Sequence, residues 1–184
     1  MTTPAPTVTV HMVASLDGFI AKPDDSIGWM DTHDTHAAGV PMGDGADVLK
    51  SIDCYVMGSH TYEHAVALSK EFGWAYGEKP VYVVSSRALQ PIKPTVEICG
   101  SDLAALMTKL TQRHGNIWVV GGARVTKELF RLQLCNDIRM MVLPVLLGGG
   151  TPFFDHIGVE LPLHLHKVTA YNNGLVELWY QLPR

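Results

Sequence analysis

The stretch Ile117-Trp118-Val119-Val120-Gly121-Gly122-Ala123-Arg124-Val125 decides how the chain folds. Its first four residues are apolar and mostly β-branched, which predicts a buried strand. The glycines that follow predict a tight turn into a helix, whose first backbone N–H groups and positive dipole end then meet at one point. Such a point suits the oxygen atoms of a phosphate. We therefore expect a phosphate-binding turn formed by Val120, Gly121, Gly122, Ala123, Arg124 and Val125.

The composition indicates a compact globular protein. The 184 residues are 47% hydrophobic and 17% charged, which favours a full hydrophobic core over disorder. We expect one domain over residues 1–184, with residues 1–6 as a disordered or extended start. The formal net charge of -4 gives no basic patch, so neither a nucleic-acid partner nor a membrane partner is expected.

Cysteine usage and the N-terminus predict a cytoplasmic location. Cys54, Cys99 and Cys135 lie far apart and are odd in number, so reduced thiols are expected. The first residues lack the basic start and apolar core of a secretory signal. The longest apolar runs fall short of the roughly 20 residues that a membrane span requires.

Predicted strands and helices alternate through residue 132. The strands are expected at residues 7–14, 19–21, 54–57, 81–84, 95–99 and 117–120. The helices are expected at residues 46–51, 59–68, 102–112 and 123–132. This alternation predicts a mostly parallel sheet with right-handed crossovers. Later strands at 137–143, 165–171 and 175–181, the last two joined by an Asn-Asn-Gly turn, predict an antiparallel C-terminal hairpin.

Some details of these elements are specific enough to be tested. Ser59 and Ser101 are expected to cap the helices that follow them. One helix is expected to bury Leu103, Leu106, Met107 and Leu110, and the next to bury Val125, Leu129 and Leu132. A short helix is also expected near residues 31–38, inside the polar segment 22–45 whose apolar anchors are Trp29 and Met30.

Three predicted strands end in small, hydroxyl-bearing or cationic residues. They are followed by Gly58-Ser59-His60-Thr61, Ser85-Ser86-Arg87 and Gly121-Gly122-Ala123-Arg124. The carboxyl ends of parallel strands lie along one edge of a sheet, where ligands bind. Hydroxyls, helix N-termini and the guanidinium groups of Arg87 and Arg124 suit a phosphate. The simpler alternative is that the glycines only permit turns and the serines only cap helices.

Five motifs resemble dihydrofolate reductase in their residues and order. They are Ala14-Ser15-Leu16-Asp17-Gly18-Phe19-Ile20-Ala21, Val56-Met57-Gly58-Ser59-His60-Thr61-Tyr62-Glu63, Val83-Val84-Ser85-Ser86-Arg87, Val119-Val120-Gly121-Gly122-Ala123-Arg124-Val125 and Leu143-Pro144-Val145-Leu146-Leu147-Gly148. The Ser-Leu-Asp-Gly and Pro-x-Leu-Leu-Gly-Gly-Gly forms are closer still to the reductase domain of bacterial riboflavin-biosynthesis deaminase/reductase proteins. The resemblance implies a dihydrofolate-reductase-like three-layer α/β/α fold, here as a stand-alone reductase domain because no deaminase part precedes it.

The resemblance implies a reduced nicotinamide dinucleotide as cofactor, NADPH in preference to NADH. It places Ala14 and Ile20 beside the nicotinamide and Gly58, Ser59, His60 and Thr61 on the phosphates. Ser85, Ser86 and Arg87 would meet the adenosine side and its 2'-phosphate. The glycine turn would wrap the pyrophosphate, with Gly121 and Gly122 joined by a cis peptide. Because Ser59 stands where dihydrofolate reductases often carry an arginine, preference for the phosphorylated cofactor rests on Arg87 and Arg124.

The substrate side rests on fewer residues. Hydride transfer to a C=N bond needs a proton, which a carboxyl group in a poorly solvated pocket can supply. Asp17, Asp31 and Asp34 are the candidates, close to Trp29. Asp34 matches the substrate-binding carboxylate of the family when counted from Trp29, and Asp17 belongs to the Ser-Leu-Asp-Gly motif. A solvated loop carboxylate for Asp34 and a turn residue before Gly18 for Asp17 stay open as alternatives.

The resemblance implies a small pterin-like or ribosylamino-pyrimidine-like substrate, as for 5-amino-6-(5-phosphoribosylamino)uracil reductases, and a homodimer formed through the C-terminal strands. Two other functions stay open. The pattern His60-x-x-Glu63-His64 is also typical of zinc hydrolases, although the reductase interpretation expects no metal. A nucleotide-binding module without turnover is the third hypothesis.

Overall fold

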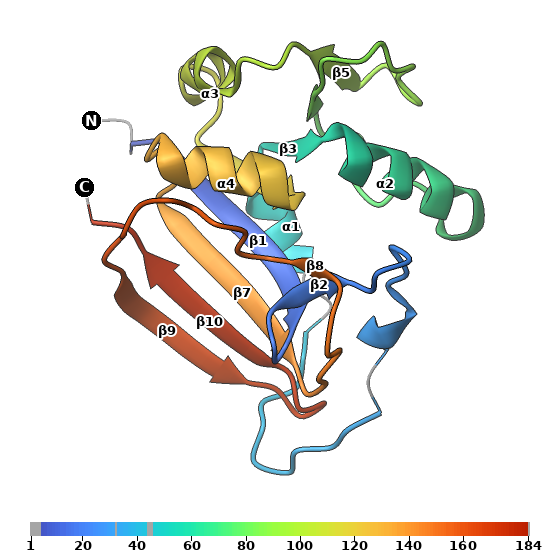
Figure 1. Ribbon diagram of the computed structural model, residues 1–184, viewed down its shortest axis with the longest axis vertical. Helices are drawn as coiled ribbons and strands as arrows, with labels where there is room; N and C mark the ends of the chain where they lie inside the picture. Colours follow the sequence, from blue (N-terminus) through green and yellow to red (C-terminus); the bar gives the residue numbers. More distant parts are fainter. Residues whose placement is uncertain (1–4, 32, 44–45, 184) are drawn as a thin grey trace.

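The computed structural model describes residues 5–31, 33–43 and 46–183 (Figure 1). Its strands are β1 (Thr7–Ser15), β2 (Phe19–Ala21), β3 (Cys54–Gly58), β4 (Val81–Val84), β5 (Val96–Cys99), β6 (Asn116–Gly121), β7 (Asp137–Leu143), β8 (Thr151–Pro152), β9 (His164–Ala170) and β10 (Val176–Gln181). Its helices are α1 (Ala46–Ser51), α2 (Ser59–Phe72), α3 (Leu103–Thr111), α4 (Ala123–Arg131) and the single 3-10 turn η1 (Gly28–Met30). Residues 1–6 were expected to be disordered or extended. Residues 1–4 of this stretch lie outside the described residues.

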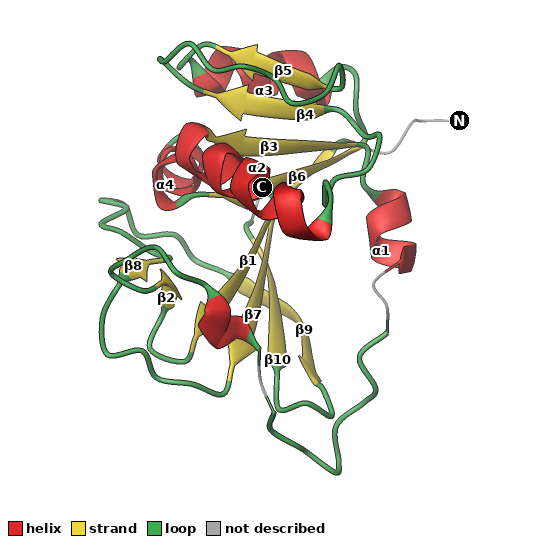
Figure 2. Ribbon diagram, turned by 90° about the vertical axis from the view of Figure 1, so that its right-hand side faces the viewer, coloured by secondary structure: helices red, strands yellow, loops and turns green. Residues whose placement is uncertain are grey.

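One sheet of eight strands carries the fold, in the order β5-β4-β3-β6-β1-β7-β10-β9. The strands from β5 to β7 in this order are parallel, whereas β7, β10 and β9 pair antiparallel (Figure 2). This confirms the mostly parallel sheet with an antiparallel C-terminal hairpin. The carboxyl ends of the parallel strands therefore share one edge, and the end of β1 lies between those of β6 and β7.

Helices cover both faces of the sheet, which confirms the three-layer α/β/α arrangement. On one face α3 and α4 pack against apolar side chains of the central strands such as Val10 and Val56. On the other face Tyr62 of α2 and Val48 of α1 pack against Trp118 and its neighbours. The sheet lies between these two hydrophobic clusters of the described residues.

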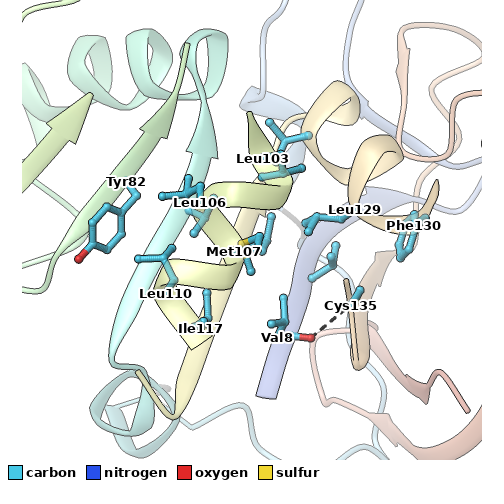
Figure 3. Packing of buried hydrophobic residues seen from close by; sticks show 14 of the residues in the cluster. Val8, Tyr82, Leu103, Leu106, Met107, Leu110, Ile117, Leu129, Phe130 and Cys135 are labelled. Carbon is cyan, nitrogen blue, oxygen red and sulfur yellow. Dashed lines mark hydrogen bonds between the residues drawn. The ribbon is translucent and has the colours of Figure 1, made fainter. Parts of the chain in front are cut away.

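Figure 3 shows how α3 is held against the sheet. Its buried side chains are Leu103, Leu106, Met107 and Leu110, the four that helical spacing predicted. Leu129 and Phe130 of α4 complete this cluster, both at most 1% exposed. Leu132, which was also expected to be buried, is 38% exposed. That prediction was wrong because α4 ends one residue earlier, so Leu132 caps the helix and no longer follows its apolar face.

The predicted serine caps were also wrong. The N-cap of α3 is Asp102, whose carboxylate accepts a hydrogen bond from the Ala105 amide at 2.9 Å. The N-cap of α2 is Gly58, with no side-chain cap, so Ser59 already belongs to the helix. The cysteines agree with the expectation of reduced thiols, since Cys54, Cys99 and Cys135 are all free.

After η1, the described residues 31 and 33–40 form an irregular segment with a turn near Gly39 and no helix. The amide of His36 donates to the Asn172 carbonyl at 2.8 Å, and Val40 exchanges backbone hydrogen bonds of 2.9 Å with Ala170 and Asn172. A helix over residues 31–38 would have used the His36 amide internally, but this amide pairs with the β9–β10 turn, to which Val40 is bound as well. The predicted helix was wrong for this reason, and the segment is instead fastened to the far end of the sheet.

A two-stranded ribbon formed by β2 and β8 stands beside the end of β1. The sequence did not predict β8, which is only two residues long. Gly150, directly before it, has φ 141° and approaches Ala21 so closely that a Cβ would lie 2.0 Å from the Ala21 carbonyl oxygen. Within the described chain, none of the helices has the length and apolar character that crossing a membrane requires.

Candidate functional site

Two strand-to-helix junctions touch at the carboxyl edge of the sheet. A Cβ on Gly58 would lie 3.1 Å from Val125 Cγ2 and 3.8 Å from the Gly122 nitrogen. A Cβ on Gly122 would lie 3.1 Å from the Thr61 hydroxyl oxygen. The junction between β3 and α2 and that between β6 and α4 are therefore one continuous surface, and glycine is what lets them approach.

The peptide bond between Gly121 and Gly122 is cis, as the resemblance implied. Gly121 has φ 108°, and a Cβ there would lie 2.4 Å from Met12 Cε of β1. The positive φ favours glycine at this position, and a larger residue would also have to displace the end of the Met12 side chain. The turn thus brings the start of α4 beside the end of β3.

Both helices at this junction begin without a side-chain cap. Gly58 and Gly122 are the N-cap residues of α2 and α4, and neither can supply a capping oxygen. The amides of the first turns, including those of His60, Thr61 and Val125, are the groups that a helix leaves unsatisfied at its start. Two neighbouring helix starts of this kind make an anion-binding surface.

Ser85, Ser86 and Arg87 form a compact turn after β4. The Ser85 hydroxyl accepts from the Arg87 amide at 2.9 Å and donates to the Arg87 carbonyl at 3.0 Å. The Arg87 guanidinium extends to α2, where Nη2 donates to Glu63 Oε2 at 2.7 Å. The side chains of Arg87 and Glu63 are 55% and 45% exposed, so a ligand can reach this ion pair from solvent.

The remaining predicted cofactor residues occupy the same edge of the sheet. Arg124 is exposed in the first turn of α4, and His60 is exposed in the first turn of α2. His60 Nε2 lies 3.4 Å from Asp25 Oδ2, so the loop after β2 reaches over the start of α2. Ala14 is fully buried near the end of β1, and Ile20 is half-buried in β2.

A pocket of about 440 Å³ opens at the end of β7, on the other side of β1 from the glycine turn. Its apolar lining comes from Trp29, Leu143, Pro144 and Val145. Its polar lining comes from Asp31, His33 and Asp34. The volume suits a small heterocycle. Trp29 and Asp34, predicted from sequence, therefore lie in one pocket with Asp31.

Asp34 is held against the turn between β9 and β10. A Cβ on Gly174, which has φ 78°, would lie 2.3 Å from Asp34 Oδ2. The indole Nε1 of Trp29 is buried and has no hydrogen-bond partner among the described residues. Both side chains are thus positioned by their surroundings, Asp34 by the docked segment and Trp29 by η1.

Asp17 is separate from this pocket lining and binds the loop after β7. Its Oδ1 accepts from the Ser15 hydroxyl at 2.6 Å and from the Leu147 amide at 3.1 Å, and its Oδ2 accepts from the Gly148 amide at 2.7 Å. The Ser15 hydrogen bond, assisted by the two amides, lowers the pKa of Asp17 to about 2. Asp17 is therefore ionised at neutral pH. These contacts favour its interpretation as a turn residue over that as a proton donor.

His33, Leu143, Pro144 and Val145 line the pocket but were not predicted as site residues. A sequence signal existed for the last three, because Leu143 ends a predicted strand, and Pro144 and Val145 follow it, at the same sheet edge as the three quoted junctions. No comparable signal marks His33, whose position depends on how residues 33–43 dock.

The residues of the zinc-hydrolase pattern have other partners. Glu63 pairs with Arg87, and His60 lies beside Asp25. Over residues 5–31, 33–43 and 46–183, no three or more His, Cys, Asp and Glu side chains are grouped so that they could hold a metal ion. These contacts join the start of α2 to the turn after β4 and to the loop after β2.

Residues 6–177 match the family model of the RibD C-terminal domain. The chain belongs to this family. One relative of this chain is the uncharacterized protein YwjB of Bacillus subtilis (strain 168). The two sequences are 31% identical over 174 residues, which are 93% of this chain and 95% of YwjB. This confirms the resemblance to the reductase part of the riboflavin proteins.

Solved structures of low sequence identity share the fold. A candidate riboflavin biosynthesis protein of Shewanella sp. PV-4 has a TM-score of 0.82 at 23% identity, over 97% of this chain and 99% of the other. The deaminase/5-amino-6-(5-phosphoribosylamino)uracil reductase of Thermotoga maritima has a TM-score of 0.67 at 17% identity, over 97% and 57%. Dihydrofolate reductase of Enterococcus faecalis, complexed with NADP(H), has a TM-score of 0.60 at 17% identity, over 97% of both chains. The family and this fold support a reductase-type function for the RibD C-terminal domain described here.

Proposed function

We propose that the protein is an NADPH-dependent reductase that transfers a hydride to a small heterocyclic or imine substrate, with NADH as a weaker cofactor. The observation that carries the proposal is the division of the sheet edge by β1. The joined glycine junctions lie on the β6 side of this strand, and the pocket lined by Trp29 and Asp34 lies on its β7 side. A cofactor on one side and a substrate on the other would meet at the end of β1.

The residues at the glycine junctions fit a dinucleotide. Gly58 and Gly122 leave room that a Cβ would fill, and the two uncapped helix starts supply amide donors for phosphate oxygens. Arg87, on the Ser85 turn, would reach a 2'-phosphate, and Arg124 the pyrophosphate. When bound, the reduced nicotinamide supplies the hydride. Structural neighbours that bind NADP(H) support this assignment.

The pocket residues would bind and orient the substrate. Trp29 offers an aromatic face, and Leu143 and Pro144 add apolar surface to the lining. Asp34 would hold the heterocycle and, with Asp31, is the candidate source of the proton for the reduced nitrogen. Asp17 would act indirectly, because it fixes the loop after β7 that continues the pocket wall.

The first experiment separates cofactor binding from turnover. NADPH and NADH are titrated while tryptophan fluorescence is followed, and cofactor oxidation is then measured with a panel of pterins, amino-pyrimidines and small carbonyl compounds. Binding followed by oxidation with one compound class supports the reductase. Binding with no turnover on any class would favour the nucleotide-binding module, and no binding at millimolar cofactor would contradict both.

An Asp34→Asn variant tests the substrate side. We expect a loss of at least tenfold in kcat/KM on any accepted substrate, with an unchanged dissociation constant for NADPH, because the carboxyl group lies in the pocket and away from the glycine junctions. Glu71→Gln in α2 is a matched control that removes one carboxylate elsewhere. Unchanged turnover in Asp34→Asn would remove this residue from the mechanism.

The zinc-hydrolase hypothesis is tested by metal analysis of the purified protein and by activity after treatment with a chelator. Stoichiometric zinc together with hydrolytic activity lost on chelation would favour it.

We further propose a cytoplasmic homodimer that assembles through the C-terminal strands. The free cysteines support the location, and the open edge at β9 supports the assembly.

A further inference from the structure

The charge of the substrate pocket differs from what a phosphorylated substrate needs. Among the described residues that line it, Asp31 and Asp34 are carboxylates and none is lysine or arginine. Within that described lining, His33 is the one side chain able to carry a positive charge, and it stands between the two carboxylates in the sequence. A phosphate carries up to two negative charges, so it would meet like charge here.

Six cations of the described chain pair with carboxylates outside the pocket. Arg87, Lys127 and Arg139 pair with Glu63, Asp155 and Glu177. Further pairs hold Lys93, Lys109 and Arg131. None of these six residues lines the pocket. Their carboxylate partners would have to be given up before any of them could serve a phosphate of the substrate.

The remaining lining fits a flat, hydrogen-bond-donating molecule. Trp29 and Pro144 offer the kind of surface on which a planar ring packs. Carboxylates accept hydrogen bonds from amino groups and protonated ring nitrogens, and two neighbouring carboxylates favour a cation further. The pocket, at about 440 Å³, has room for a one- or two-ring heterocycle.

We infer that this pocket takes a planar, amine-bearing heterocycle without a phosphate group, and that it discriminates against phosphorylated compounds of the same ring. The inference rests on the proposed function for the identity of the pocket as the substrate site. It separates this chain from the Thermotoga maritima protein of the same fold, which is named for a phosphoribosyl substrate. In this inference Asp31 and Asp34 determine the specificity, because their negative charges repel a phosphate and attract an amine.

The test uses matched pairs of ligands and does not require turnover. Binding of a ribosylamino-pyrimidine and of its 5'-phosphate is measured by isothermal titration calorimetry, with and without saturating NADP⁺ to occupy the anion-binding glycine junctions. 2,4-Diaminopyrimidine and uracil form a second pair, in which the first carries amino groups where the second carries carbonyl oxygens. We expect the unphosphorylated member to bind at least tenfold more tightly, and 2,4-diaminopyrimidine to bind more tightly than uracil.

Variants show whether the lining causes this selectivity. The double change Asp31→Asn and Asp34→Asn should reduce the preference for the unphosphorylated member to less than threefold, and His33→Arg should raise the affinity for the phosphorylated member at least fivefold. Glu71→Gln, which removes a carboxylate outside the pocket, should change neither. Retained circular dichroism and NADPH affinity show that each variant is folded.

Three results would overturn the inference. They are equal or tighter binding of the phosphorylated member in the wild type, a preference unaffected by the aspartate changes, and no binding of any of the four compounds at millimolar concentration. NADPH titration of the same samples shows whether the pocket inference fails alone or the proposed reductase function fails as well. Loss of NADPH binding with retained heterocycle selectivity contradicts the reductase and leaves the pocket assignment standing.

Discussion

Arg87, the residue expected to meet a 2'-phosphate, is already paired with a carboxylate. Its Nη2 lies 2.7 Å from Glu63 Oε2, and a 2'-phosphate would bring a second negative group to the same guanidinium. We expect Glu63→Gln to raise the ratio of NADPH to NADH affinity by about two- to fivefold, because exposed ion pairs contribute below about 1 kcal/mol. Titrations of both cofactors, followed by tryptophan fluorescence, measure this ratio.

The control for this change is Glu128→Gln in α4. Glu128 also pairs with an arginine, Arg131, and its exposure of 43% is close to that of Glu63, but both partners lie away from the Ser85 turn. It should leave the ratio unchanged. Equal ratios in the wild type and Glu63→Gln would show that Arg87 does not read the 2'-phosphate.

His11 makes the stability of the protein depend on pH. Its ring stacks on Trp118 of β6 with centroids 4.6 Å apart. Burial, together with the nearby Arg139 and against the opposing effect of Glu177, lowers the pKa of His11 from 6.5 to about 4. Between these two pH values the unfolded chain binds a proton that the folded chain does not. Stability is therefore full above pH 6.5 and falls by up to about 3 kcal/mol as the pH drops towards 4.

His11→Phe isolates this contribution. The phenyl ring keeps an aromatic contact with Trp118 and does not titrate, so we expect the free energy of unfolding to vary less between pH 4 and 6.5 than in the wild type. Urea denaturation at several pH values measures it. The same slope in both proteins would assign the acid sensitivity to other groups.

The docking of segment 33–43 on the β9–β10 turn shapes the substrate pocket. A Cβ on Gly39 would lie 2.4 Å from the Tyr171 carbonyl carbon and oxygen, whereas a Cβ on Gly43 would meet nothing within 4 Å. Gly39→Ala should therefore displace the segment, lower Tm and weaken heterocycle binding severalfold, because His33 and Asp34 move with it. Gly43→Ala should do neither, and NADPH affinity should stay unchanged in both. Calorimetry and ligand titration of the two variants test this; equal pocket affinity would mean that docking does not shape the site.

The elements that the sequence predicted well are those whose own residues determine them. The helix α3 follows from the spacing of Leu103 and its apolar partners, and β6 from an apolar run that ends in glycines. The predicted helix over 31–38 failed because His36 donates its amide to the distant hairpin turn. No local pattern reports a pairing of that kind.

The candidate site likewise contains some features that the sequence alone predicts and others that it does not. Glycine positions such as Gly58 and Gly121 could be predicted because they belong to short motifs, and a Cβ at either would meet a neighbouring side chain. The contact between Arg87 and Glu63, which lie on different elements, could not be read from either motif alone. Likewise, the three hydrogen bonds accepted by Asp17 come from residues both near and far in the sequence, so only the assembled fold distinguishes a loop anchor from a proton donor.

The sheet as a whole assigns different tasks to its parts. The half from β5 to β6 carries the glycine junctions and the Ser85 turn, and the half from β7 to β9 carries the pocket wall and the turn that holds Asp34. The strand β1 lies between them and is paired on both sides. Because the antiparallel strands support only the substrate half, changes at β9 and β10 should affect substrate binding before they affect cofactor binding.

The outermost strand β9 presents apolar side chains to solvent on the sheet face that carries α3 and α4. Leu165 and Val168 are 48% and 52% exposed, and Figure 1 shows β9 and β10 extending beyond these helices. An exposed apolar strand with an open edge invites pairing with a second copy. We expect wild-type protein to sediment at twice the monomer mass at micromolar concentration, and Val168→Glu to shift it to the monomer, because the new charge would be buried in the interface. Lys167→Glu, on the opposite face of the same strand, should leave the mass unchanged. A monomeric wild type would contradict the homodimer, and a dimeric Val168→Glu would move the interface away from this face of β9.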